Sequence, residues 1–373
     1  MGKKILVCFG TRPEAIKMGS LVHELKKTAF EVKVCVTAQH RQMLDQVLDF
    51  FEIAPDFDLD LMTDNQTLNG LSSRIFAEMD KVFTEWTPDL VLVHGDTTTS
   101  SICAWSAFHR GIKTGHVEAG LRTYDKYAPF PEEINRQVTG RIADFHFAPT
   151  ETSKQNLLSE HTPENAITVT GNTVIDSLLW TVGKLDNGFS NERISEIENL
   201  LDHTKKLILV TGHRRENFGE GFRNICKALA EIASDQNNEI LFPVHLNPNV
   251  QKPVRELLSN LPNVHLVEPL DYPSFVWAMK KATLIITDSG GVQEEAPSLG
   301  KPVLVMRETT ERPEAVEAGT VKLVGTDAKL IVETAVELLQ NPSVYENMSK
   351  AYNPYGDGKA NERIVEFLKN NFA

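Results

Sequence analysis

Cysteine is scarce in this chain of 373 residues, and it never occurs in a motif. The four cysteines, Cys8, Cys35, Cys103 and Cys226, are widely spaced and form no CxxC pair. This spacing favours buried free thiols in a cytoplasmic protein. No group of histidine, aspartate and cysteine residues has the spacing of metal ligands, so we expect no metal.

Long hydrophobic runs are also missing. No stretch approaches the roughly 20 apolar residues that a membrane-spanning helix needs. The N-terminus carries two lysines, but the apolar run that follows them is shorter than the roughly 7–15 residues of a signal peptide. We interpret this run as a buried first strand, and we expect a cytoplasmic protein without a membrane partner.

Positive charge is in deficit, because the net charge is −13. This balance opposes binding to nucleic acid, which depends on cationic surfaces that meet phosphates. It leaves room for a small anionic ligand, since a local cluster of arginine, lysine and histidine outweighs the global charge. A GxGxxG motif is absent after the first apolar run, so we expect no dinucleotide cofactor, and no cofactor of any other kind is indicated.

What the sequence does contain is a regular alternation of short apolar runs and amphipathic stretches, which is typical of doubly wound α/β sheets. The runs show little polar alternation, as expected for strands buried on both faces. The strands expected in the first half are Lys4–Phe9, Glu31–Thr37, Leu90–His94, Lys113–Glu118, Phe145–Ala148 and Ile167–Gly171. The helices expected there are Ala15–Lys27, His40–Phe51, Gly70–Trp86, Thr98–Arg110 and Glu132–Ala143.

The same pattern restarts after a polar stretch at 186–206. The strands expected in the second half are Leu207–Thr211, Glu239–Val244, Val264–Val267, Leu284–Thr287, Pro302–Met306 and Val321–Val324. The helices expected there are Gly221–Ser234, Pro248–Asn260, Pro273–Lys281, Gly291–Leu299 and Ala328–Leu339. We therefore predict an α/β protein with two Rossmann-like doubly wound domains that face a central cleft. The predicted division is 1–172 for the first domain, 173–355 for the second, and 356–373 for a final helix that packs back on the first domain.

Polar residues follow the apolar runs of the first half, at the strand ends where open parallel sheets bind ligands. Arg12 and Lys17 come after the first strand, where they are either anion-binding groups or solvated loop charges. Asp96 follows the third expected strand and is either a functional carboxylate or a helix N-cap. Glu118 ends a buried strand, and a buried carboxylate is rare unless it is paired or functional.

A second acidic group stands at the start of the helix expected after Pro131. Glu132 favours the positive end of that helix, and Arg136 lies four residues later on the same face. The simpler interpretation of the pair is an i,i+4 salt bridge.

The second half carries cations and a glycine turn at its strand ends. His213 and Arg214 form a compact cationic cluster suited to phosphate oxygens, and His245 follows the next strand. The run Ser289-Gly290-Gly291 lies between a strand and a helix, where free backbone amides favour an anion. Glu295 is placed to bind a ribose diol, and Arg312 adds another cation. The alternative for the Ser-Gly-Gly run is an ordinary turn.

The chain resembles the non-hydrolysing bacterial UDP-N-acetylglucosamine 2-epimerases over essentially its whole length. The motifs that carry the resemblance include GTRPEAIK, HGDTTT, HVEAGLRT, GNTVID, TGHRREN and TDSGGVQEEAPSLGKPVL. The resemblance implies the GT-B architecture, a cytoplasmic homodimer, and the substrates UDP-GlcNAc and UDP-ManNAc, the latter supplied to surface polysaccharides.

The resemblance also implies roles for individual residues. Acid–base roles fall among Asp96, Glu118 and Glu132, and the diphosphate falls mainly to His213, Ser289 and Gly290. The substrate-contact positions of the family match Arg12, Lys17, Arg136, Phe275, Gly291, Glu295 and Arg312. The positions at which some members bind a second, activating UDP-GlcNAc match Gln39, Gln42, Glu132, Arg214 and His245, with departures at Asn65 and Leu270.

The expected reaction is reversible inversion of C2 by elimination of UDP to 2-acetamidoglucal and re-addition of UDP. Two alternatives share the architecture, namely a GT-B glycosyltransferase and a hydrolysing epimerase, and both would release UDP for good. A nucleotide-sugar binding module is a third alternative, although a binder of an anion has no need of three carboxylates.

Overall fold

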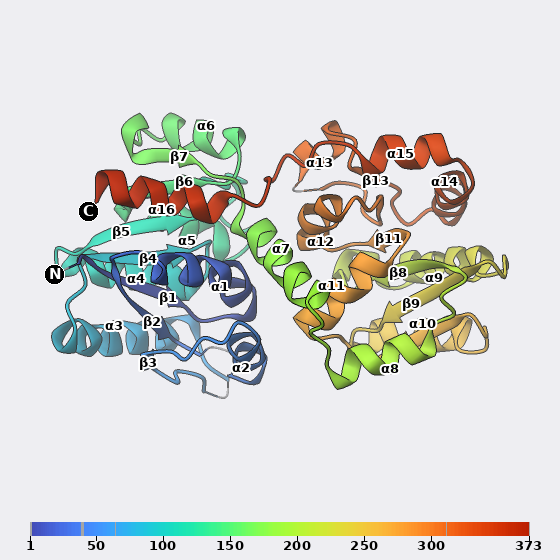
Figure 1. Ribbon diagram of the computed structural model, residues 1–373, viewed down its shortest axis with the longest axis horizontal. Helices are drawn as coiled ribbons and strands as arrows, with labels where there is room; N and C mark the ends of the chain where they lie inside the picture. Colours follow the sequence, from blue (N-terminus) through green and yellow to red (C-terminus); the bar gives the residue numbers. More distant parts are fainter. Residues whose placement is uncertain (1, 39–40, 64, 311, 373) are drawn as a thin grey trace. The chain divides into compact units, whose positions relative to one another are not determined.

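The computed structural model describes residues 2–38, 41–63, 65–310 and 312–372. The chain forms two compact units, Met1–Trp180 with Tyr355–Ala373, and Thr181–Pro354 (Figure 1). Each unit is a parallel sheet with its own helices, so the predicted fold class of two Rossmann-like α/β domains is confirmed. Within the described ranges, no helix is both long and apolar enough to cross a membrane.

The first sheet has the strand order β3-β2-β1-β4-β5-β6-β7, and every pair in it is parallel. Its strands are β1 (Lys4–Phe9), β2 (Glu31–Val36), β3 (Phe57–Asp58), β4 (Leu90–His94), β5 (Lys113–Val117), β6 (Phe145–Ala148) and β7 (Ile167–Val169). Its helices are α1 (Arg12–Lys26), α2 (Arg41–Phe50), α3 (Leu68–Glu85), α4 (Thr98–His109), α5 (Glu132–Ile142), α6 (Glu151–Ser159) and the final α16 (Ala360–Asn371), with α7 (Thr173–Asp186) leading into the second unit.

The first sheet is buried on both faces, as the apolar strands require. Leu6 and Cys8 pack in one cluster with α3 and α4, while their neighbours Ile5, Val7 and Phe9 are equally buried. Because successive side chains of a strand point to opposite faces, helices must cover both sides of β1. All four cysteines are buried and free, as predicted.

The second sheet has the order β10-β9-β8-β11-β12-β13 and is also parallel throughout. Its strands are β8 (Lys206–Thr211), β9 (Asn238–Pro243), β10 (Val264–Val267), β11 (Leu284–Thr287), β12 (Val303–Val305) and β13 (Val321–Leu323). Its helices are α8 (Glu192–Leu200), α9 (Glu220–Ile232), α10 (Pro248–Leu258), α11 (Tyr272–Lys281), α12 (Gly290–Glu295), α13 (Pro313–Glu317), α14 (Ala328–Gln340) and α15 (Pro342–Ser349).

The first turns of α7 pack within the first unit, so the unit ends at Trp180 rather than at the predicted residue 172. The Trp180 ring stacks on Phe51 at 4.7 Å between centroids and on His23 at 5.4 Å. The Ser177 hydroxyl lies 2.7 Å from that of Ser20 on α1. These contacts hold the start of α7 against α1 and move the boundary into the helix.

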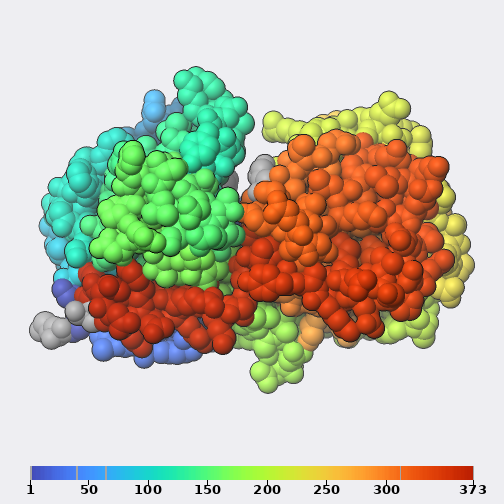
Figure 2. Space-filling model, turned by 90° about the horizontal axis from the view of Figure 1, so that it is seen from above, coloured from blue at the N-terminus to red at the C-terminus, as the bar shows by residue number. Residues whose placement is uncertain are grey.

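The final helix α16 also belongs to the first unit, and Figure 2 shows it in red on the surface, beside the green segment of α6 and β7. Its Phe367 packs edge-on against Phe145 and Phe147 of β6. The buried carboxylate of Asp176 on α7 accepts the backbone N–H groups of Ala360 and Asn361 at 3.2 and 2.9 Å. The start of the helix is therefore capped by a residue far away in sequence.

Candidate active site

In each sheet the strand order reverses once, between β1 and β4 in the first unit and between β8 and β11 in the second. Open parallel sheets bind ligands at such switch points, beyond the carboxyl ends of the strands. Arg12 and Asp96 follow the two switch strands of the first unit, and His213 and Ser289 follow those of the second. Residues that the sequence analysis selected one strand at a time are thus adjacent in pairs.

Glu118 lies directly after β5 with a φ of +63°, in the left-handed region that non-glycine residues rarely adopt. Its side chain is 8% exposed and forms an ion pair with Lys17 of α1. The same carboxylate oxygen, Oε1, accepts a hydrogen bond of 2.9 Å from Nδ2 of Asn172. Since a strained backbone persists only where its surroundings fix it, these bonds hold Glu118 in place.

His94 lies behind Glu118, with its Nε2 3.6 Å from Glu118 Oε2. Burial lowers the pKa of His94 to about 4, although the neighbouring Glu118 carboxylate acts in the opposite direction. His94 is therefore neutral at pH 7, and Lys17 is the cation that pairs with Glu118.

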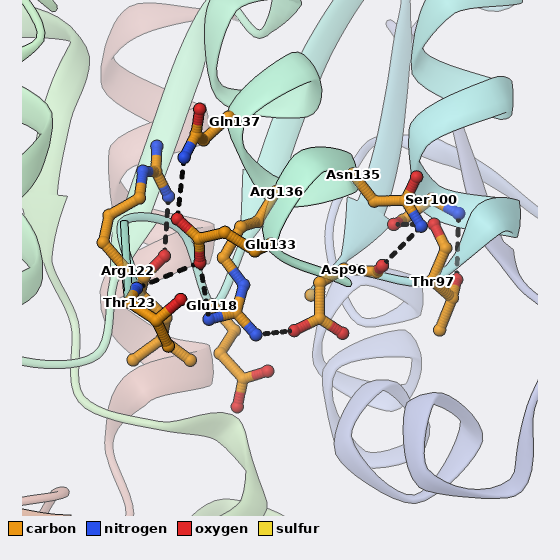
Figure 3. Close-up of polar contacts among 12 residues, drawn as sticks. Asp96, Thr97, Ser100, Glu118, Arg122, Thr123, Glu133, Asn135, Arg136 and Gln137 are labelled. Atoms are coloured by element: carbon orange, nitrogen blue, oxygen red, sulfur yellow. Dashed lines mark hydrogen bonds and ion pairs between the residues drawn. The ribbon is translucent and has the colours of Figure 1, made fainter. Parts of the chain in front are cut away.

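Asp96, Arg136 and Glu133 form a chain of charges beside Glu118 (Figure 3). The Arg136 guanidinium donates to Oδ2 of Asp96 and, at 3.4 Å, to Oε2 of Glu133. Burial raises the pKa of Asp96, and the nearby Glu118 charge adds to this effect, while Arg136 opposes it. The amide of Asn135 donates to the Asp96 backbone oxygen at 2.9 Å, which fixes the loop after β4.

Glu133 takes the place in this network that the sequence analysis gave to Glu132. The expected i,i+4 salt bridge between Glu132 and Arg136 is absent. The side chain of Glu132, half-buried at the start of α5, forms no hydrogen bond or ion pair with the described residues. Glu133 is fully buried and accepts backbone N–H groups from Thr123 and Tyr124. Burial alone would raise the pKa of Glu133, but these hydrogen bonds and Arg136 outweigh it and lower the pKa.

Glu14 is a second buried carboxylate that sequence reasoning missed, although it lies in the motif that contains Arg12 and Lys17. Its Oε2 accepts the N–H groups of Gly10 and Thr11, and its Oε1 accepts the hydroxyl of Thr97 at 2.6 Å. Glu14 therefore ties the loop after β1 to the loop after β4. The signal for it was present, because threonine followed three residues later by glutamate is a capping box.

The second unit builds its site around Asp288, which directly follows β11 and is fully buried. Its Oδ2 accepts the backbone N–H groups of His213 and Arg214, each at 2.8 Å. Partial burial lowers the pKa of His213, while Asp288 opposes this change and His245 and Arg214 add to it. The His213 ring stacks on His245 at 5.4 Å between centroids.

The Ser289-Gly290-Gly291 run opens α12, and no side chain caps this helix start. A Cβ atom at Gly290 would lie 3.9 Å from the Arg214 guanidinium, and one at Gly291 would lie 3.8 Å from the Glu295 carboxylate. The two glycines therefore leave their backbone amides free of side chains, one beside a cation and the other beside a carboxylate. Backbone amides presented in this way suit a phosphate, and the carboxylate suits a neighbouring diol.

Three further predicted residues have defined surroundings in the second unit. Glu295 is buried and accepts a hydrogen bond of 3.3 Å from the Tyr272 hydroxyl. Arg312, half-buried before α13, forms an ion pair with the buried Glu294. Phe275 lies half-buried on α11.

The residues predicted to bind a second nucleotide sugar are distributed over both units. Gln42 is exposed on α2 of the first unit, whereas Arg214 and His245 belong to the second. Gln39 lies outside the described residues. The His213–His245 stack brings one predicted activator residue against one predicted catalytic residue.

Each unit thus gathers its own set of polar groups at the carboxyl ends of its strands. The first unit gathers Glu118 and Asp96 at one sheet edge. Glu118 is paired with a lysine, and Asp96 is paired with an arginine and has a raised pKa. The second unit gathers a histidine, an arginine and uncapped amides, which favour a developing anionic charge.

Comparison with known proteins assigns the family. A family model described as UDP-N-acetylglucosamine 2-epimerase matches residues 23–369. The chain is 58% identical over 374 residues to the UDP-N-acetylglucosamine 2-epimerase of Escherichia coli K12, with 99% of each chain covered. It is 57% identical over 369 residues to that of Salmonella typhimurium LT2, with 98% of each covered.

A solved structure agrees with these relatives. The UDP-GlcNAc 2-epimerase of Neisseria meningitidis, bound to UDP-GlcNAc, superposes with a TM-score of 0.89 at 51% identity, covering 99% of this chain and 100% of that one. The chain belongs to the UDP-N-acetylglucosamine 2-epimerase family.

Proposed function

We propose that this protein is an isomerase that interconverts UDP-N-acetylglucosamine and UDP-N-acetylmannosamine by inverting C2 of the sugar. The observation that carries the proposal is the pair Glu118 and Asp96, two carboxylates of one sheet edge held in different electrostatic settings. Glu118 pairs with the ammonium group of Lys17, whereas Asp96, which is half-buried and pairs with the guanidinium of Arg136, has a raised pKa. Inversion at a carbon needs a base on one face and an acid on the other. Two carboxyl groups in different electrostatic environments can fill these two roles.

Removal of the C2 hydrogen is difficult because no carbonyl group adjoins C2 to stabilise the resulting charge. Departure of UDP solves this problem, since the C1–O bond breaks with its electron pair leaving on the diphosphate. C1 then resembles an oxocarbenium ion, and a carboxylate can remove the acidified C2 proton. The product is 2-acetamidoglucal, and re-addition of UDP with protonation on the opposite face of C2 completes the inversion.

Residues of the second unit are proposed to stabilise the departing diphosphate. The proposed groups are His213, Arg214 and the amides of Ser289, Gly290 and Gly291, with Glu295 on the ribose. Preorganised donors of this kind stabilise the charge that develops when the C1–O bond breaks.

Glu118 acts as the base and Asp96 as the acid in the direction that starts from UDP-GlcNAc. Proton transfers by such groups typically contribute roughly 10²–10⁴-fold each. Glu132, half-buried at the start of α5, is the third candidate. Arg12, Lys17, Phe275 and Arg312 are proposed to contact the substrate.

The test is proton NMR of the purified protein with UDP-GlcNAc in D₂O, without cofactor or acceptor. The proposal expects UDP-ManNAc to appear and both sugars to gain deuterium at C2. An untouched substrate, or free sugar and UDP without UDP-ManNAc, would overturn it in favour of a glycosyltransferase or a hydrolysing enzyme.

A cytoplasmic homodimer that feeds surface polysaccharide synthesis completes the proposal. Two ring side chains of α4 support the dimer, because Trp105 is 40% and Phe108 61% exposed, and a second copy would bury them. Light scattering after size exclusion tests this point, since the proposal expects twice the mass of one chain for the wild type and a shift toward monomer for Phe108→Glu.

A further inference from the structure

We propose that Asn172 is a positioning residue for Glu118, and that its side-chain amide orients the carboxylate that reacts. The inference deepens the proposed function and rests on it, because it assumes that Glu118 is a reacting group. It starts from the position of Asn172, which follows β7 and precedes α7, where it is 3% exposed.

The oxygen and the nitrogen of the Asn172 side-chain amide form hydrogen bonds with different partners. Oδ1 accepts the backbone N–H of Val174 at 3.1 Å, within the first turn of α7. Nδ2 donates to Oε1 of Glu118 at 2.9 Å. Because the cap requires the oxygen to face the helix, the amide group must face the carboxylate.

Asn172 is itself fixed by its backbone. Its N–H donates to the Tyr355 carbonyl oxygen at 2.7 Å, and Tyr355 is the first residue of the segment that returns to the first unit. Its carbonyl oxygen accepts the N–H of Ile175 at 3.1 Å. A donor held in this way presents its hydrogen at a defined point, and it costs no further ordering when the carboxylate binds to it.

Glu118 needs such a donor because its backbone is in the left-handed region. Lys17 already pairs with Oε1, but a lysine ends in a flexible chain with a rotating ammonium group. The planar amide of Asn172 fixes the direction from which Oε1 is approached, and thereby the direction of the whole carboxylate. The ionisable groups around Glu118 include Lys17 from α1, His94 from β4 and Asp96 from the loop after β4.

The substitution Asn172→Asp separates the capping of α7 from the hydrogen bond to Glu118. Aspartate is as good a helix cap as asparagine, so the bond from Val174 survives. The donor that faced Glu118 becomes an acceptor with a negative charge, and two adjacent carboxylates do not both ionise readily. The variant Asn172→Ser retains a cap and adds no charge, and its shorter side chain removes the amide group that reaches Glu118.

Asn341→Asp is the matched control. Asn341 caps α15 with Oδ1, which accepts the N–H groups of Ser343 and Val344 at 3.1 and 3.4 Å. It is exposed and lies in the second unit, so the same chemical change there meets no reacting carboxylate.

The experiment measures UDP-ManNAc formation, the pH profile and the thermal midpoint for the wild type and the three variants. We expect kcat to fall at least about ten-fold in both Asn172 variants, as for a lost hydrogen bond to a charged group, with KM within about two-fold. We also expect the acid limb of the profile to move to higher pH in Asn172→Asp. Asn172→Ser and Asn341→Asp should keep the thermal midpoint of the wild type, whereas the second buried carboxylate of Asn172→Asp should lower it.

Two results would overturn the inference while leaving the proposed function intact. One is an active wild type with Asn172 variants that retain its kcat and acid limb. The other is a loss of activity in Asn172→Ser that only accompanies a lowered thermal midpoint, which would make Asn172 a structural cap. An inactive wild type would instead refute the proposed function.

Discussion

Nδ1 of His213 lies 3.5 Å from Oδ1 of Asp288, and the other oxygen of this carboxylate accepts the His213 backbone N–H at 2.8 Å. The two residues follow β8 and β11, neighbouring strands of the second sheet. One buried carboxylate therefore anchors the backbone of the histidine that is proposed to face the diphosphate, and it also places a negative charge beside the ring.

His213→Ala should slow cleavage of the C1–O bond, and Asp288→Asn should do so indirectly. The asparagine keeps one oxygen for the two backbone N–H groups but loses the negative charge, so these hydrogen bonds are weakened and the charge beside the His213 ring is removed. We expect kcat to fall about ten-fold or more in each variant, from a lost charge-assisted hydrogen bond. Asp327→Asn, at the exposed cap of α14, is the control and should retain the wild-type kcat. Unchanged turnover in His213→Ala would remove this histidine from the mechanism.

Glu118→Gln should lower kcat far more than it weakens UDP binding. The glutamine keeps the size of the side chain but cannot accept a proton, so kcat should fall by roughly 10²-fold or more. Calorimetry should find the affinity for UDP within about three-fold of the wild type, a small change in free energy. Glu151→Gln, at the exposed start of α6, is the control. Equal losses in kcat and UDP affinity would make Glu118 a binding residue instead.

Acid should destabilise the first unit through its buried histidines. Burial lowers the pKa of His94 and His146 to about 4 and that of His116 to about 3. In the unfolded chain these histidines bind protons near pH 6.5. The stabilisation that comes from their neutral form in the folded protein is therefore complete above that pH, and it is lost as the pH falls toward 4. For His146 alone the loss amounts to about 3 kcal/mol at pH 4.

Urea denaturation of the wild type and of His146→Leu between pH 7 and pH 4 measures this effect. The wild type should lose stability steeply over this range, and the variant should show a shallower dependence. Equal slopes for the two proteins would show that His146 does not carry the effect.

Asp176→Ala should loosen the final helix α16. The change leaves the N–H groups of Ala360 and Asn361 without their buried acceptor, which costs about 2–4 kcal/mol of unfolding free energy. Asp357→Ala breaks an exposed ion pair with Arg363 of the same helix and should cost less than about 1 kcal/mol. Denaturation curves compare the two variants, and similar losses would contradict the assigned anchor.

Most helices and strands were predictable because their apolar periodicity is local. The strand predictions Lys4–Phe9, Leu90–His94 and Val264–Val267 match the structure residue for residue. The elements that were missed, β3, α6, α8, α13 and α15, are short or largely polar. In α8 the buried apolar positions are Ile194 and Ile197, too few to show a period.

The roles of the site residues were harder to predict than their positions. Glu132 and Glu133 are adjacent acids at a helix start, and nothing local distinguishes them. The structure buries Glu133 against Thr123 and Tyr124, because the loop before α5 folds over that side of the helix. Glu133, which anchors this loop, and Glu132, which does not, can be told apart only from the path of a segment that is distant in the sequence.

By itself the sequence determined the alternation of strands and helices, and it determined which polar residues stand at the strand ends, since both follow from short-range periodicity. Only the tertiary structure decided which of these residues meet. Lys17 pairs with Glu118 across 101 positions, Asn172 reaches it across 54, and Asp288 holds His213 across 75. These partnerships depend on the order of strands in the two sheets, which is set by packing between segments that are far apart in the chain.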